Sequence, residues 1–154
     1  MPGWAAWGAV LGVAVAALLG CGPKAPDRRL PAACQAGQDA VDRVLRAAPR
    51  AVRLDGVPLS DCFDPQSDGA ELQAVGVSFV GAAANLAERA RQRPEGPAAM
   101  QLGYLVGAMR KGAGRTNAQG IHTELVRRVE QELTLVDPDS RALRRGASAG
   151  ARSG

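Results

Sequence analysis

Apolar residues recur at spacings of three and four along most of the chain, and this period predicts a helical protein. The longest stripe comprises Leu72, Val75, Phe79, Ala83, Leu86 and Ala90. Apolar side chains at this spacing share one face of an α-helix. Because no charged residue occurs between Leu72 and Ala87, we expect this helix to be buried on more than one side.

The two ends of this helix carry recognisable signals. Asp68 and Glu71 have the spacing of a capping box, which predicts Asp68 as the N-cap. Pro94 ends the helix, since proline cannot continue the hydrogen-bonded ladder. The last turn is rich in arginine, where the helix dipole favours cations: Arg89, Arg91 and Arg93.

Three further segments have the same helical period. The first covers residues 34–48 with Val41, Val44, Leu45 and Ala48, and Pro49 ends it. The next begins with Pro97 and carries Ala99, Leu102, Leu105, Val106 and Met109. The last is capped by Asn117, carries Ile121, Leu125, Val129, Leu133 and Val136, and ends at Asp137-Pro138. Short connections between four helices predict an all-α, four-helix bundle-like domain.

Two local signals add detail to this domain. Asp55-Gly56 between alternating apolar residues predicts an ordered loop or short hairpin near residues 52–60. Gly103 and Gly107 lie on one face of a helix, and their low helix propensity implies a compensating close helix approach. The Ala- and Gly-rich helix that begins after Asp68 is the expected partner, with a dimer face as the alternative.

The N-terminal segment has a different pattern. Residues 4–19 form an uncharged apolar run, which is shorter than the ~20 residues of a membrane-spanning helix. The run ends in Leu18-Leu19-Gly20-Cys21, and this ending resembles the lipobox of bacterial lipoproteins. The segment therefore fits a signal peptide and is excluded from the fold.

The resemblance implies a lipid-anchored, exported protein. Residues 1–20 would be the signal peptide, and Cys21 would carry the lipid that anchors the chain in a membrane. The protein would then lie on the outer face of the cytoplasmic membrane, or in the outer membrane if the cell has one. Residues 21–33, rich in proline, would form a tether, residues 34–137 the helical domain, and residues 138–154 a disordered basic tail with Arg141, Arg144, Arg145 and Arg152.

With Cys21 assigned to lipid, Cys34 and Cys62 remain as a pair. An exported compartment permits their oxidation, and a disulfide would stabilise a core that contains few large residues. Outside the signal segment those large aromatic residues are Phe63, Phe79 and Tyr104. The alternative is a pair of buried free thiols.

A candidate anion-binding site surrounds the Gly-rich link after residue 109. Arg110, Lys111 and Arg115 flank this link, and the chain's one histidine, His122, follows in the first turn of the next helix. Cations beside a helix N-terminus can hold a phosphate or a carboxylate. The alternative is a solvated interhelix loop with a surface histidine.

The remaining residues show no catalytic constellation and no metal-ligand spacing, so we expect no enzyme activity, no metal and no cofactor. The net charge of +4 has two interpretations. We favour ordinary surface charge that keeps the protein in solution; the alternative, for an exported protein, is contact with anionic lipid or an anionic polymer of the envelope rather than nucleic acid. We expect an interaction or structural component of the cell envelope. Two other functions stay open: a small anionic-ligand-binding module at residues 110–122, and an enzyme without a recognisable motif.

Overall fold

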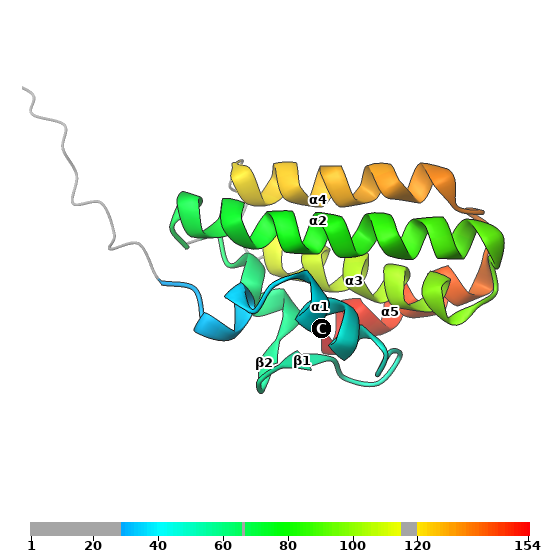
Figure 1. Cartoon of the computed structure of the whole chain (residues 1–154), viewed down its shortest axis with the longest axis horizontal. Helices are drawn as coiled ribbons and strands as arrows, with labels where there is room; N and C mark the ends of the chain where they lie inside the picture. The colour runs from blue at the N-terminus through cyan, green and yellow to red at the C-terminus, as the bar shows by residue number, and fades with distance from the viewer. Residues whose placement is uncertain (1–28, 66, 115–119) are drawn as a thin grey trace, which may run out of the picture.

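A computed structural model of the chain describes residues 29–65, 67–114 and 120–154. These residues fold mainly into helices (Figure 1). The α-helices are α1 (Gln38–Leu45), α2 (Gly69–Gln92), α3 (Pro97–Ala113), α4 (Ile121–Glu132) and α5 (Arg141–Ser153). Single 3₁₀ turns lie at Ala32–Gln35, Leu59–Phe63 and Leu133–Leu135, and the strands are β1 (Arg53–Leu54) and β2 (Val57–Pro58).

The helix α3 lies at the centre of the molecule and contacts α2, α4 and α5 (Figure 1). Its predicted apolar face is confirmed, since Ala99, Leu102, Leu105, Val106 and Met109 are all buried. The whole predicted stripe of α2 is buried as well. In the core, the rings of Phe63 and Phe79 meet edge to face with their centroids 4.7 Å apart.

The predicted cap of α2 is confirmed. The side chain of Asp68 accepts hydrogen bonds from the backbone N–H groups of Ala70 and Glu71. By length and composition α2 could cross a membrane, and 44% of its most apolar window is buried inside the fold.

The segment before α2 forms a small unit on one flank. The first helix begins later than predicted, because Gly37 adopts a positive φ of 85° and separates α1 from the turn at Ala32–Gln35. The predicted hairpin is confirmed, with Arg53 opposite Pro58 and Leu54 opposite Val57. Its two turn residues, Asp55 and Gly56, both have positive φ, as the Asp-Gly signal requires.

The predicted disordered tail is wrong, because residues 141–153 form α5. The helix packs along α3 and buries Ala142, Leu143 and Ala149. Its arginines lie on the other side, where Arg144 contacts Asp139 and Arg152 contacts Ser148. The tail was predicted to be unfolded because its buried positions are mostly alanine and glycine, which give a weak apolar period.

Glycines on both helices allow α3 and α5 to touch through their backbones; we call Gly103, Gly107, Gly146 and Gly150 the glycine interface. A Cβ at Gly103 would overlap the carbonyl oxygen of Leu143, and a Cβ at Gly146 would overlap that of Met100. The close approach predicted for the Gly103–Gly107 face is therefore present, but its partner is α5 and not α2.

The two ends of α5 are tied to the rest of the fold. At its start, Ser140 Oγ donates a hydrogen bond to the carbonyl oxygen of Pro94 and accepts one from Leu143 N. The carboxylate of Glu95 accepts from the N–H groups of Arg141 and Ala142 at 2.8 and 3.1 Å. The loop between α2 and α3 thus caps the start of α5.

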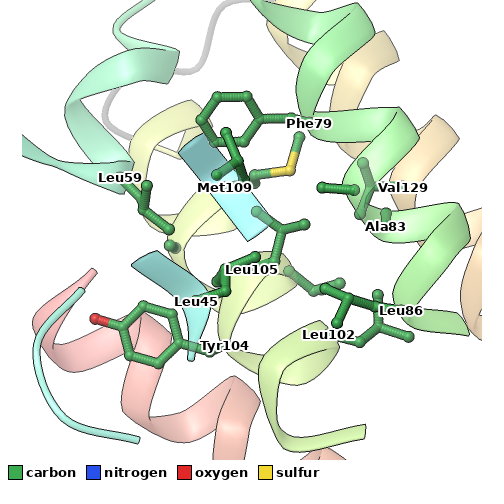
Figure 2. Close-up of a cluster of buried hydrophobic side chains, with 14 of the residues drawn as sticks. Leu45, Leu59, Phe79, Ala83, Leu86, Leu102, Tyr104, Leu105, Met109 and Val129 are labelled. Carbon is green, nitrogen blue, oxygen red and sulfur yellow. The ribbon is translucent and has the colours of Figure 1, made fainter. Parts of the chain in front are cut away.

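Tyr104 joins the end of α5 to the segment before the hairpin. Its ring is fully buried, and Figure 2 shows its hydroxyl at the edge of the core cluster. That hydroxyl accepts a hydrogen bond from Val52 N at 2.9 Å and lies 3.3 Å from Ser153 Oγ. A buried tyrosine needs such partners, since an unpaired buried hydroxyl is costly.

The predicted disulfide between Cys34 and Cys62 is confirmed. Both residues are fully buried, and their Cα atoms are 5.5 Å apart. The bond joins the turn before α1 to the turn that precedes α2, and Ser60 in that second turn donates to the carbonyl oxygen of Gly154 at 2.8 Å. The disulfide therefore holds together the two segments that flank α1 and the hairpin.

Gly103→Ala is expected to lower the free energy of unfolding by about 2 kcal/mol, because the new methyl group must push α5 away from α3. Helix propensity alone favours alanine over glycine by about 1 kcal/mol, so a net loss reports on the interface. The matched control is Gly69→Ala, where an added Cβ has nothing within 4 Å. Urea denaturation measures both; a Gly103→Ala protein as stable as the control would contradict the contact.

Reduction of the disulfide is expected to lower the free energy of unfolding by about 3.5 kcal/mol, because the cross-linked loop restricts the unfolded chain. The two cysteines are separated by 28 positions in the sequence. Urea titrations with and without a reductant measure the difference. Cys34→Ser combined with Cys62→Ser should be insensitive to the reductant, and an equal response of both proteins would refute the assignment.

Candidate functional site

The predicted anion-binding residues do not converge on one site in the part of the chain that the structure describes. Arg110 Nε lies 2.7 Å from Glu130 Oε1 on α4, so its charge is already paired. Lys111 Nζ instead donates to the carbonyl oxygens of Arg152 and Gly154 at 3.1 and 3.0 Å. His122 is 3% exposed, which does not fit the alternative of a surface histidine, and Arg115 lies outside the described residues.

The predicted lipidation residue, Cys21, also lies outside the described residues, as does most of the predicted tether. The last residues of that tether, however, belong to the folded domain. Leu30 is buried, and its N–H donates to the carboxylate of Glu71 at 2.8 Å. The predicted boundary at residue 34 is therefore too late.

A different group of cations lines a groove on the flank of the domain. The groove lies between α1, the end of α2 and the start of α3, and its cavity volume is about 280 Å³. We call it the arginine groove; the residues that matter to its chemistry are Asp42, Arg46, Arg89, Arg93, Ala98 and Gln101.

The three arginines come from the C-terminal ends of α1 and α2. Arg46 is the C-cap residue of α1, Arg89 lies in the last turn of α2, and Arg93 is the C-cap residue of α2. Cations are favoured at all three positions by the negative end of the helix dipole. The sequence signal for Arg89 and Arg93 was therefore visible, but their proximity to Arg46 follows only from the packing of α1 against α2.

The backbone adds to the positive character of the groove. The helix α3 begins here with Gly96 as N-cap and Pro97 in its first turn, and no side chain caps it. Ala98, in that first turn, lines the groove. Unsatisfied N–H groups at a helix start carry partial positive charge and attract anions. The arrangement can therefore hold an oxyanion, through guanidinium groups and the start of a helix.

Other chemistry finds less support in the described residues. No group of three or more His, Cys, Asp or Glu side chains in residues 29–65, 67–114 and 120–154 could hold a metal ion. No protein-family model, no curated protein and no solved structure matches the chain. The argument for function therefore depends on the residues themselves.

The arginines of α4 differ from those of the groove, because they are committed to a carboxylate. Arg127 and Arg128 both hydrogen-bond to Glu124, and these bonds lower the pKa of Glu124 from its ordinary 4.5 to about 2. A lowered folded-state pKa stabilises the fold above the unfolded value, and that contribution is lost as the pH falls from about 4.5 towards 2.

The side-chain carboxyl of Glu124 is therefore expected to titrate with a midpoint near 2, as followed by its ¹³C chemical shift. In Arg127→Gln the midpoint should move up towards the ordinary value, because the first of the stabilising hydrogen bonds is lost. A wild-type midpoint of 4.5 would contradict the pairing.

Proposed function

We propose that the protein is an exported lipoprotein whose folded domain serves the cell envelope as an interaction or structural component. Its anchor would be lipid on Cys21, at the end of an apolar run that resembles a lipobox. The observation that carries the proposal is the Cys34–Cys62 disulfide, because disulfides form and persist outside the reducing cytoplasm. Assigning Cys21 to lipid also accounts for the cysteine that the disulfide leaves over.

The lengths of the segments support the same proposal. The first buried residue of the domain, Leu30, follows Cys21 closely in the sequence. An extended segment gains about 3 Å per residue, so a domain tethered there would lie within about 30 Å of the bilayer surface. Two or three acyl chains on one cysteine would hold it firmly, since each buried methylene contributes about 0.8 kcal/mol.

The domain itself is proposed to be of the four-helix-bundle type, with α2, α3, α4 and α5 as its helices and α1 on one flank. This assignment replaces the first predicted helix by α5, which packs along the central α3 (Figure 1). Such a domain presents helix faces to partners, and the proposal assigns it no catalytic activity and no cofactor.

A second candidate function, the binding of a small anion, was predicted for the region of Arg110 and His122. The pairing of Arg110 with Glu130 argues against that location. The arginine groove, at the other end of α3, favours anion binding there instead.

Cys21→Ser is expected to abolish the incorporation of an alkyne-labelled fatty acid and to release the protein from the membrane fraction. The matched control is Cys34→Ser combined with Cys62→Ser, which removes the other two cysteines and should keep the label. Label on the Cys21→Ser protein, or none on the wild type, would refute the anchor. An envelope protein that copurifies with the wild type and not with Cys21→Ser would support the interaction role.

A further inference from the structure

We propose that the arginine groove binds a small soluble molecule that carries both an oxyanion, such as a phosphate, and a hydrogen-bond donor, such as a hydroxyl. The cavity of about 280 Å³ is close to the lower limit of small-molecule pockets, about 300 Å³, so it suits only a small ligand. This inference is independent of the lipid anchor, because it concerns only the folded domain.

The unpaired charge of the groove is the first argument. Arg46, Arg89 and Arg93 form no ion pair and no side-chain hydrogen bond with any described residue. By contrast, Arg91, on the same turn of α2, is paired with Glu88 at 2.8 Å. Asp42 is the one carboxylate among the lining residues, so the three arginines leave the groove with a net positive charge. Guanidinium groups bind phosphate or carboxylate bidentately.

The start of α3 provides the second argument. The starts of α2 and α5 are capped by the side chains of Asp68 and Ser140, whereas the starts of α3 and α4 have no side-chain cap. The first turn of α3 receives no side-chain cap, and Ala98 in that turn faces the groove. An oxyanion in the groove would accept from these N–H groups while it also neutralises the arginines.

Asp42 gives the third argument and sets the second requirement on the ligand. Asp42 lines the groove, and its Oδ1 atom is buried beneath the groove surface without a hydrogen-bond partner among the described residues. A buried carboxylate oxygen without a donor is costly, so a ligand that supplies a hydroxyl or amine hydrogen would satisfy it. A plain anion cannot do this, whereas a phosphate with a neighbouring hydroxyl can.

The location of the groove favours a soluble ligand over the headgroups of the anchoring membrane. The chain enters the domain beside the start of α2, where Leu30 N donates to Glu71. At 1.5 Å per helical residue, Arg89 lies about 27 Å further along α2. Figure 1 shows this end of α2 on the opposite side of the molecule from the first described residues, which are drawn in blue. The groove is thus remote from the point at which a lipid anchor would join the domain.

The test is calorimetric titration of the full chain in neutral dodecyl maltoside micelles with glycerol 3-phosphate and with methyl phosphate. We expect saturable binding of glycerol 3-phosphate with a Kd below about 1 mM at pH 8, and weaker binding of methyl phosphate, which lacks an alcohol hydroxyl. Arg46→Gln and Arg93→Gln should each weaken binding about tenfold, because each removes a charge-assisted hydrogen bond. All these arginines are exposed, so the variants should fold.

Two control variants distinguish a specific binding site from nonspecific attraction of anions to a basic protein. Arg91→Gln removes the same charge from the same turn of α2 but outside the groove, and it should leave the Kd unchanged. Asp42→Ala removes the buried carboxylate and should abolish the preference for glycerol 3-phosphate while methyl phosphate still binds. Equal losses in Arg91→Gln and Arg93→Gln, or no binding of either ligand, would overturn the proposal.

A competition experiment distinguishes a soluble phosphate ester from a phospholipid headgroup as the ligand. Phosphatidylglycerol added to the micelles should not compete with glycerol 3-phosphate, because the groove is expected to take a soluble ligand. Competition by phosphatidylglycerol would overturn that part and identify a lipid headgroup as the occupant. Titrating Cys21→Ser in the same way should give the same Kd, so that failure of the anchor and failure of the groove are seen separately.

Discussion

The contact between α3 and α5 is the constraint on which the rest of the structure depends. Glycine at Gly103, Gly107, Gly146 and Gly150 brings the two backbones together, and no side chain of ordinary size fits between them. Close backbones gain dispersion and weak Cα–H···O contacts over a long interface. Because α3 also packs against α2 and α4, the position of α5 affects the whole core.

The loop between α2 and α3 connects the start of α5 to the arginine groove. Glu95 and Pro94, between α2 and α3, hold the start of α5 with side-chain and backbone oxygens. The next residues, Gly96 and Pro97, line the groove and start α3. Contacts with α5 therefore restrict the motion of the loop that lines the groove. A binding site that is ordered before the ligand arrives loses less conformational entropy on binding.

Much of the fold was predictable because its signals are local. Pro94 and Pro97 mark helix ends, Asp68 caps α2, and large apolar residues at helical spacing identify the buried faces. Because Cys21 was assigned to lipid, the sequence predicts a disulfide between the two remaining cysteines, Cys34 and Cys62. The structure confirms this disulfide.

The features that the sequence did not predict depend on contacts between segments that are distant in the sequence. The helix α5 is buried mainly through alanine and glycine, so its apolar period is weak and the sequence predicts a disordered tail over residues 138–154. The glycines of α3 predicted a close approach without identifying the partner. Arg110 of the predicted anion site is paired with Glu130, a residue of another helix that the local sequence pattern does not identify. The arginine groove was missed because Arg46 and Arg89 are far apart in sequence and meet only after folding.

The central claim is that α5 is an integral part of the core, and amide hydrogen exchange of residues 141–153 tests it most directly. The account predicts that the amides in the middle of α5, around Gly146 and Gly150, exchange as slowly as those of the buried α3, because both open only when the domain unfolds. Exchange of the α5 amides at the rate of an unstructured peptide, while α3 stays protected, would contradict it.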